Sequence, residues 1–257
     1  DYPMQARVGV ARALINSNVP FEHVTASDIR NDLAPRYPII YLPGTLSLSE
    51  DIIEKLIQYV KQGGRLVMDL PGAWFDKNAA MLYSEKGTPF ERLFGVTIND
   101  YQFSGVNVYH AIEALPLEGF TLRFTATNAD ILYNYENGQP AITEMKLGSG
   151  EAVMLGYEAS RMCFEPGNDL AEAGLIKYTL GDWSSPYTCQ GAIAYRLAGK
   201  NADHYFLINE GPETTAILES SILNYSKAED AVTGESLDPG SPITIQRNNG
   251  RWIRFEK

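Results

Sequence analysis

The sequence predicts an α/β fold in which a doubly wound, mostly parallel sheet is followed by a small antiparallel β-sandwich. Three observations predict it. Residues 1–183 alternate apolar runs with amphipathic segments across short connections rich in glycine and proline. Residues 37–44, "YPIIYLPG", are almost continuously apolar, as is typical of a parallel strand buried on both faces. From residue 184 onward, short alternating strands follow one another. We therefore expect two domains, 1–183 and 184–257.

Composition places the chain among ordinary globular proteins and excludes several partners. Apolar residues make up 44% and charged residues 21% of the 257 residues, which indicates folded domains rather than disorder. The net charge of −11 leaves no basic stripe, so we expect neither nucleic acid nor a membrane as a partner. The sequence has no apolar run of about 18 residues and no signal peptide at its start. It fits a cytoplasmic, periplasmic or secreted protein alike.

The chain opens with a predicted helix, whereas a strand-helix unit opens with a strand. In "MQARVGVARALINSNVP", apolar residues recur at helical spacing and predict its buried side: Met4, Val8, Ala11 and Ile15. Residues 21–26 then predict a strand and residues 27–33 a short helix. The first strand of the sheet is therefore missing from the pattern. We interpret the chain as the downstream part of a longer polypeptide, or one whose N-terminus was lost; the alternative is a fold that begins with a helix.

The clearest helix is "SLSEDIIEKLIQYVKQGG", residues 47–64. Ser49 or Ser47 can cap its start, and Gly63-Gly64 ends it. Its apolar side repeats at helical spacing and comprises Ile52, Ile53, Leu56, Ile57 and Val60. The strand "RLVMDL" follows directly, so this stretch closes a strand-helix-strand unit.

Further elements complete the two predicted domains. Residues 88–96 predict a short helix, residues 97–127 irregular strands, and residues 129–158 strands broken at two glycine-containing turns. Residues 169–183 predict a helix whose core side is Leu170, Ala173, Leu175, Ile176 and Leu180. The strands of the predicted sandwich are "AIAYRLA", "HYFLINE", "TTAILE", "PITIQR" and "RWIRFE".

Two carboxylates stand at the carboxyl ends of presumed central strands. Asp69 ends "RLVMD", and Glu158 follows "AVMLGY". Ligands of doubly wound sheets bind outside this edge, so both side chains can face one crevice. Paired carboxylates are what glycoside hydrolysis requires. The alternative is that each carboxylate caps a helix or accepts hydrogen bonds from loop amides.

The loop after "RLVMDL" supplies the other candidate residues. It carries Trp74, Phe75, Asp76 and Tyr83 in a stretch otherwise rich in small and charged residues. Aromatic rings anchor protein interfaces and also contact sugars. We interpret this loop as a candidate crevice or subunit interface, with sugar contact and packing inside the domain as alternatives.

No pattern in the sequence predicts catalysis, a cofactor or a metal. Cys163 and Cys189 lie in unrelated contexts, and we expect two unpaired, buried thiols. His23, His110 and His204 are scattered along the chain. The "LGSGE" stretch lies between two strands, whereas a serine nucleophile elbow lies between a strand and a helix. "GTLSLSE" has too few glycines for a phosphate cradle. We therefore expect no catalytic residue, cofactor or metal.

These residues carry a resemblance to a known family. The run "YLPGTLSLSEDIIEKLIQYVKQGGRLVMDLPG", followed by a loop and "PFERLFGV", resembles the trimerisation domain of the family 42 glycoside hydrolases, which are β-galactosidases. "LGSGEAVMLG" is similar to the Gly-Lys-Gly strand turn of that family, with Ser149 where lysine is more usual. "HYFLINEG" and "DAVTGESL" resemble the small β-domain that closes those enzymes. The matching pieces span most of the chain.

The resemblance implies partners that this chain does not contain. In that family a catalytic (β/α)₈ barrel with two glutamates precedes these domains, and no barrel pattern is present here. The resemblance therefore implies self-association into a homo-oligomer and an upstream catalytic barrel. It leaves carbohydrate open as a further partner.

The α/β domain also resembles class I glutamine amidotransferases and flavodoxin-like sheets. The amidotransferase cysteine lies in a G-x-C-x-G turn after a central strand, and "MDLPGAW" places Leu70 there. Leucine cannot act as a nucleophile. We interpret the chain as a non-catalytic accessory and oligomerisation portion of a β-galactosidase-like glycoside hydrolase. Two alternatives stay open: a free-standing small-molecule-binding protein of amidotransferase-like fold, and a carbohydrate-binding module on the sandwich.

Overall fold

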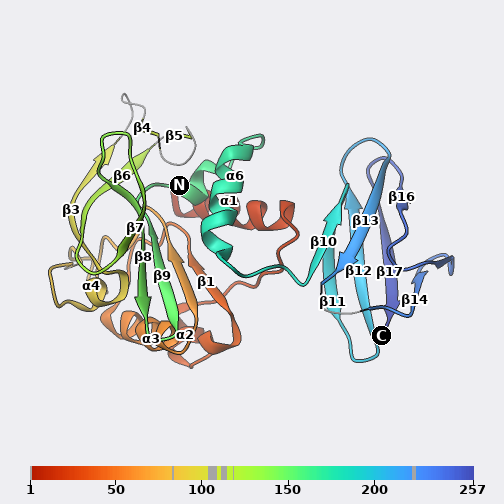
Figure 1. The fold of residues 1–257 in the computed structure, drawn as a ribbon, viewed down its shortest axis with the longest axis horizontal. Helices are drawn as coiled ribbons and strands as arrows, with labels where there is room; N and C mark the ends of the chain where they lie inside the picture. Colours follow the sequence, from red (N-terminus) through yellow and green to blue (C-terminus); the bar gives the residue numbers. More distant parts are fainter. Residues whose placement is uncertain (1, 83, 104–108, 111–114, 118, 222–223) are drawn as a thin grey trace. The chain divides into compact units, whose positions relative to one another are not determined.

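A computed structural model describes residues 2–82, 84–103, 109–110, 115–117, 119–221 and 224–257 of the chain (Figure 1). The chain divides into two compact units. The first, the α/β unit, comprises Asp1–Ala13 and His23–Gly181, and the second, the sandwich unit, comprises Leu14–Glu22 and Asp182–Lys257. The fold is therefore mixed α/β, and the first unit begins with a helix.

The α/β unit contains short helices and a central sheet. The helices are α1 (Tyr2–Asn16, whose last turn belongs to the sandwich unit), α2 (Ala26–Arg30), the 3₁₀ turn η1 (Ala34–Arg36), α3 (Glu50–Lys61), α4 (Pro89–Phe94), α5 (Ala159–Met162) and α6 (Asp169–Leu180). The strands are β1 (Ile39–Leu42), β2 (Arg65–Met68), β3 (Val96–Phe103), β4 (Tyr109–His110), β5 (Pro116–Leu117), β6 (Phe120–Ala126), β7 (Asp130–Asn134), β8 (Pro140–Leu147) and β9 (Gly150–Leu155).

The central sheet has the strand order β1-β2-β9-β8-β7 (Figure 1). β1, β2 and β9 pair in parallel, whereas β8 pairs antiparallel with both β9 and β7. The sheet is thus half antiparallel, and the prediction of a mostly parallel sheet was wrong in this respect. The reason is the tight turn at Gly148-Ser149, because a connection this short can only join antiparallel strands.

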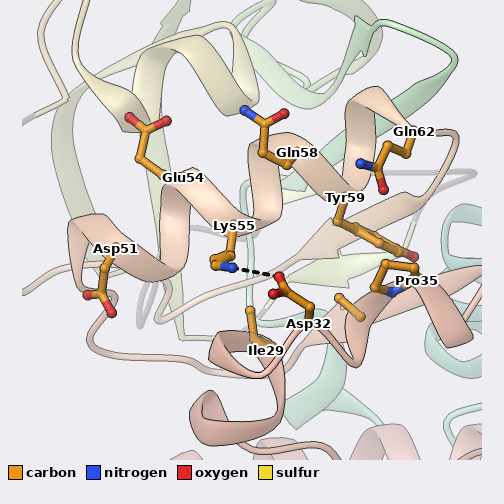
Figure 2. A pocket seen from close by; sticks show the side chains of 10 residues that line it. Ile29, Asp32, Pro35, Asp51, Glu54, Lys55, Gln58, Tyr59 and Gln62 are labelled. Carbon is orange, nitrogen blue, oxygen red and sulfur yellow. Dashed lines mark hydrogen bonds and ion pairs between the residues drawn. The ribbon is translucent and has the colours of Figure 1, made fainter.

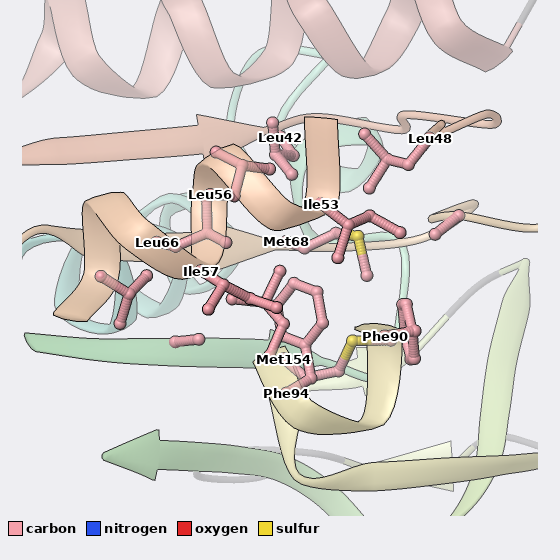
Figure 3. Close-up of a cluster of buried hydrophobic side chains, with 14 of the residues drawn as sticks. Leu42, Leu48, Ile53, Leu56, Ile57, Leu66, Met68, Phe90, Phe94 and Met154 are labelled. Atoms are coloured by element: carbon pink, nitrogen blue, oxygen red, sulfur yellow. The ribbon is translucent and has the colours of Figure 1, made fainter. Parts of the chain in front are cut away.

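Helix α3 forms where it was predicted and contributes its apolar side to the main core of this unit (Figure 3). All five residues of its predicted apolar side are buried, against Leu66 and Met68 of β2 and Met154 of β9. The predicted end is also confirmed, since Gly63 adopts a left-handed φ of 107° that L-residues avoid. Its start carries no side-chain cap: Ser49 is the N-cap residue but makes no capping hydrogen bond.

The predicted buried side of α1 was wrong. Met4 and Val8 are exposed, and the helix instead buries Ala6, Val10, Ala13 and Leu14. The reason is a close backbone approach: a Cβ built on Gly9 would lie 1.8 Å from the carbonyl oxygen of Ser160. Only the side of α1 with small residues can approach α5 this closely.

The predicted core side of α6 was also wrong in part. Leu170 of α6 is exposed, and that helix packs through smaller residues around Leu175, namely Ala171 and Gly174, together with Tyr178 and Thr179.

Residues 21–26 form no strand. Instead, Thr25 and Asp28 form a capping box that starts α2: Asp28 N–H donates to the Thr25 hydroxyl, and Thr25 N–H donates to the Asp28 carboxylate at 2.7 Å.

Arg65 and Leu66 are adjacent on β2 and point to opposite faces of the sheet. Leu66 packs in the core with α3, whereas the side chain of Arg65 reaches helix α6. Its guanidinium donates to the carbonyl oxygens of Tyr178 at 2.8 Å and Thr179 at 3.0 Å, which belong to the last turn of α6. The same group forms an ion pair with Glu151 of β9 and lies 3.6 Å from Glu144 of β8. Arg65 therefore ties the C-terminus of α6 to three neighbouring strands.

The sandwich unit consists of two antiparallel sheets. One has the order β10-β13-β16 and the other β11-β12-β17-β14-β15. The strands are β10 (Tyr187–Gln190), β11 (Ile193–Ala198), β12 (Ala202–Asn209), β13 (Thr214–Ser220), β14 (Lys227–Asp230), β15 (Ser236–Leu237), β16 (Ile243–Ile245) and β17 (Asn249–Glu256). The five predicted strands are confirmed as β11, β12, β13, β16 and β17.

Asn18 anchors residues 14–22 to this unit, a role that no pattern in the sequence predicted. The side chain is buried, donates to the carbonyl oxygen of Cys189 at 3.0 Å and accepts from the N–H of Ala194 at 2.7 Å. Its own carbonyl oxygen accepts from the Ser185 hydroxyl. These bonds explain why a segment far away in sequence belongs to the sandwich.

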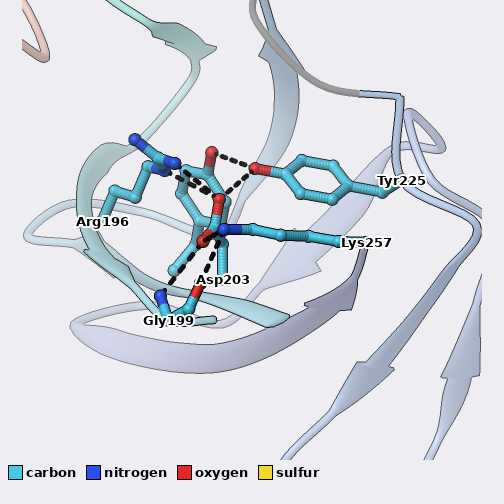
Figure 4. A network of polar contacts seen from close by, with 6 residues as sticks. Arg196, Gly199, Asp203, Tyr225 and Lys257 are labelled. Atoms are coloured by element: carbon cyan, nitrogen blue, oxygen red, sulfur yellow. Dashed lines mark hydrogen bonds and ion pairs between the residues drawn. The ribbon is translucent and has the colours of Figure 1, made fainter. Parts of the chain in front are cut away.

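A buried carboxylate binds side chains from the beginning and from the end of the sandwich sequence (Figure 4). Asp203 is fully buried and accepts hydrogen bonds from Arg196, Tyr225, Lys257 and the N–H of Gly199. Burial by itself raises the pKa of Asp203, but the bonds from Lys257, Arg196 and Tyr225 outweigh burial and hold the pKa at about 2.

We expect Asp203→Asn to destabilise the sandwich by about 2 kcal/mol, because it leaves two cations partly buried without their carboxylate. The ionised carboxylate stabilises the fold above its unfolded pKa of about 3.9, and this contribution is lost as pH falls towards about 2. The variant should therefore lose less stability than the wild type over that interval. Urea unfolding between pH 2 and 7 measures both effects. Glu229→Gln, in the more exposed pair with Arg254, is the matched control and should change stability by under about 1 kcal/mol.

Candidate functional site

The carboxyl ends of β1, β2 and β9 meet at one edge of the sheet, and Asp69 lies beneath it. Its carboxylate is fully buried and accepts from the N–H of Gly44 at 2.8 Å, the N–H of Ser160 at 2.7 Å and the Ser160 hydroxyl. Burial raises the pKa of Asp69 to about 6, although these hydrogen bonds oppose the shift. Asp69 thus fastens the β1 loop to the start of α5.

Glu158 lies at the same edge and is also fully buried. One carboxylate oxygen pairs with Arg161, whose guanidinium lies 5.1 Å from the ring centroid of Tyr2. The other oxygen, Oε1, has no hydrogen-bond partner among the described residues. Burial raises the pKa of Glu158, and the Arg161 charge opposes the shift. The structure therefore places both predicted carboxylates at one edge and beneath the surface; Asp69 bonds to two other segments, whereas Glu158 pairs with Arg161 of the helix that it begins.

Trp74 packs within its own unit. Its ring meets Tyr101 of β3 edge-on at 4.6 Å and Phe120 of β6 at 5.0 Å between centroids. Its indole N–H is buried and has no partner among the described residues. The loop continues with Phe75, which is exposed and is bridged to Ser47 and Met81 through its backbone.

Asp76 organises the loop itself. Its carboxylate accepts from the N–H groups of Asn78 at 2.8 Å and Ala80 at 3.0 Å, and its carbonyl oxygen accepts from the Ser47 hydroxyl. This is the arrangement of an Asx turn, which shapes the loop locally. Tyr83, the remaining predicted residue, lies outside the described residues.

Two exposed apolar residues near Trp74 were not anticipated from the sequence. Met81 is 73% exposed and lies on the same loop, and Phe103 is 62% exposed at the end of β3. The Phe103 ring contacts Phe120 at 5.3 Å, and Phe120 in turn contacts Trp74. Phe75, Met81 and Phe103 together are called the loop patch below. The sequence contains only a weak signal for this patch, because isolated exposed apolar residues are common.

The strand-end turn, where the amidotransferase resemblance would place a cysteine, carries Leu70. Leu70 is fully buried. The two cysteines are free and buried, as predicted, and burial raises the pKa of Cys163 to about 12 and of Cys189 to about 11. Thiols with such pKa values stay protonated near neutral pH and are poor nucleophiles.

A groove of about 520 Å³ lies between the segment of α2 and η1 and helix α3 (Figure 2). Its three acidic residues are all paired: Asp32 with Lys55 at 2.6 Å, Asp51 with Arg30 at 2.7 Å, and Glu54 with Arg92. These contacts do not indicate that the groove binds a particular ligand.

Neither a metal centre nor a membrane span emerges from the described part of the chain. Within those residues, no three histidine, cysteine or acidic side chains are grouped closely enough to hold a metal ion. No helix there has both the length and the apolar character needed to cross a bilayer.

The geometry defines a mixed α/β domain with an exposed aromatic loop, followed by a β-sandwich. Residues 12–169, more than half of the chain, match the model of the β-galactosidase trimerisation domain. The chain belongs to this family, and the resemblance noted in the sequence is confirmed. A search of curated protein sequences found no match.

Solved structures match the whole fold. Gan42B, a GH42 β-galactosidase, matches with a TM-score of 0.79 and 18% identity over 100% of this chain. The β-galactosidase from Bacillus circulans sp. alkalophilus matches with a TM-score of 0.77 and 14% identity over 99% of it. The enzyme from the Antarctic haloarchaeon Halorubrum lacusprofundi has a TM-score of 0.63 at 14% identity over 100% of it. This chain spans 36%, 38% and 36% of those chains, respectively.

Proposed function

We propose that the chain is the non-catalytic oligomerisation portion of a larger glycoside hydrolase of the β-galactosidase type, and that the α/β unit assembles into a trimer through the loop patch. The family match over residues 12–169 supports this most directly. The share of the matched structures that this chain spans leaves room for a catalytic domain in the same polypeptide.

The division of labour follows from the two units. The α/β unit, which comprises most of residues 1–183, is the oligomerisation domain, and the sandwich unit, which comprises residues 184–257 together with 14–22 and 182–183, is an accessory domain. The parallel strands β1, β2 and β9 carry α3 on one face, while Arg65 reaches α6, which supports a doubly wound, amidotransferase-like description of this half of the sheet. No observation favours a free-standing binding protein or a carbohydrate-binding module over this proposal.

The loop patch has the character of an interface. Phe75, Met81 and Phe103 are exposed, while the rings behind them, Trp74 and Phe120, are packed against each other. Interface cores are enriched in aromatic residues and methionine, and a few such side chains carry most of the binding energy. Asp76 holds the loop in shape, which lowers the cost of ordering it on association.

We expect the purified chain to form trimers and the double variant Met81→Ser/Phe103→Ser to weaken them. Loss of one apolar anchor at an interface costs about 2 kcal/mol, so the dissociation constant should rise at least about tenfold. Sedimentation velocity over a range of concentrations measures it. The matched control is Leu170→Ser, which removes an exposed apolar side chain from α6 and should leave association unchanged.

Thermal melts of the same samples show whether the double variant is still folded. Because Met81 and Phe103 are exposed, the double variant should keep the melting temperature of the wild-type monomer to within a few degrees. A chain that stays monomeric at all concentrations would contradict the proposed assembly. Equal weakening by Leu170→Ser would contradict the assignment of the interface to the loop patch.

A further inference from the structure

The sandwich unit has an apolar outer surface that its own core does not require. β11, β12 and β17 lie side by side (Figure 1), and their registers align Tyr195, Phe206 and Trp252 in one row across the sheet. Leu197 and Ile208 flank this row on the same face, and the five side chains are between 36% and 62% exposed. These five residues are called the outer apolar face.

The alternation along each strand shows that this face is separate from the core. The inward neighbours, such as Tyr205, Leu207 and Ile253, are fully buried and fill the space between the two sheets. An antiparallel sheet with one face in water normally carries polar residues on that face. Contiguous exposed apolar surface instead marks a site of interaction.

The chemistry of the face suits an apolar protein surface better than a sugar. The rings of Phe206 and Trp252 stack on each other at 5.4 Å with 25° between their planes, so one face of each ring is already covered. The indole N–H of Trp252 donates to His204 at 3.0 Å, and the nearby cation Arg254 is paired with Glu229 and Glu256. A carbohydrate needs open ring faces and available polar groups, and these contacts cover one face of each stacked ring and occupy the indole N–H and the Arg254 cation.

The size of the face indicates which kind of protein contact it makes. An aromatic side chain has about 150–250 Å² of surface, so each ring exposes roughly 60–100 Å², and the whole face roughly 400 Å². Stable complexes of separate proteins bury about 800 Å² per partner. Interfaces between domains of one chain bury about 600–1,500 Å² in total, or roughly half of that per side. The face therefore fits a contact between tethered domains.

We propose that the outer apolar face is the docking surface for the catalytic portion of the same polypeptide. This proposal rests on the proposed function, in which that portion exists. The family match ends at residue 169, so the trimerisation description covers none of the residues of this face. The matched structures have nearly two-thirds of their length outside the part that this chain covers, and that remainder is the partner large enough to cover the face.

Covalent labelling of exposed side chains tests the proposal. A photoactivated carbene reagent is applied to the 257-residue chain and to the full-length polypeptide that contains it, and labelled residues are counted by mass spectrometry. Labelling of Tyr195, Phe206 and Trp252 should fall about fivefold in the full-length polypeptide, as expected when rings about two-fifths exposed become interface core. Val232, 76% exposed in the same unit but outside the face, should keep its labelling.

A variant extends the test. Phe206→Lys in the full-length polypeptide should restore labelling of Trp252, while Val232→Lys should not. Equal labelling of the face in both chains overturns the proposal. Labelling that is already low in the 257-residue chain, or that falls as its concentration rises, also overturns it, because the occupant would then be part of this chain or a second copy. These outcomes do not depend on trimer formation, which sedimentation decides separately; a full-length polypeptide without a glycosidase portion would instead count against the proposed function.

Discussion

Arg65→Ala is expected to lower the free energy of unfolding of the α/β unit by about 3–5 kcal/mol. The guanidinium is nearly buried, and its removal leaves Glu151 without its partner and the carbonyl oxygens of Tyr178 and Thr179 without their donor. Buried acceptors and charges that lose their partner cost more than the original interaction contributed. In a unit of this size, such a loss lowers the melting temperature by roughly 10 °C.

The measurement is calorimetry or urea unfolding of the whole chain, in which the transition of the α/β unit should move and that of the sandwich should stay. Arg30→Ala is the matched control, because Arg30 pairs with Asp51 at 2.7 Å but both side chains are about half exposed. Exposed pairs contribute under about 1 kcal/mol. Equal effects of the two substitutions would show that Arg65 does not hold α6 to the sheet.

Gly9→Ala is expected to destabilise the α/β unit by about 3 kcal/mol, against the usual preference of helices for alanine. In a solvent-exposed helix this substitution stabilises by about 0.5–1 kcal/mol. Here the new Cβ would lie 1.8 Å from the Ser160 carbonyl oxygen and 3.1 Å from the Phe164 nitrogen, both backbone atoms that cannot rotate away. Helix α1 would have to move away from α5. A destabilising effect, opposite in sign to the effect in an exposed helix, is therefore the result that identifies the close approach.

Val8→Ala on the exposed side of the same helix is the control and should change stability by under about 0.5 kcal/mol. Hydrogen exchange supplies a second readout, since Gly9→Ala should raise amide exchange in α1 and α5 and leave α3 protected. A stabilising effect of Gly9→Ala would be incompatible with the close approach of α1 to α5.

The sequence determined the elements whose information is local. Helix α3 has a single apolar side, so its spacing alone identified five of its six buried residues, all but Tyr59, and its end at Gly63. The strand at β1 and five sandwich strands follow from short-range patterns in the same way, but the predicted burial of β1 on both faces was wrong, because β1 is an edge strand in which buried and half-buried residues alternate. The absence of a nucleophile at Leu70 needed only the identity of one residue.

Tertiary contacts decided the elements in which two local patterns competed. Helix α1 has apolar residues on both sides, and the close approach of Gly9 to Ser160 selected the side with small residues over Met4 and Val8. Asp69 and Glu158 were correctly placed at strand ends, but the partners of Asp69, Gly44 and Ser160, come from other segments, whereas Glu158 pairs locally with Arg161, three residues further along.

The exposed loop patch and the outer apolar face likewise depend on which residues remain uncovered after folding. Periodicity reports that a side chain is apolar and where it lies on its own element. It carries no information on the distance between backbones that meet only in the fold. That distance determines which side of a helix is buried and which rings stay exposed.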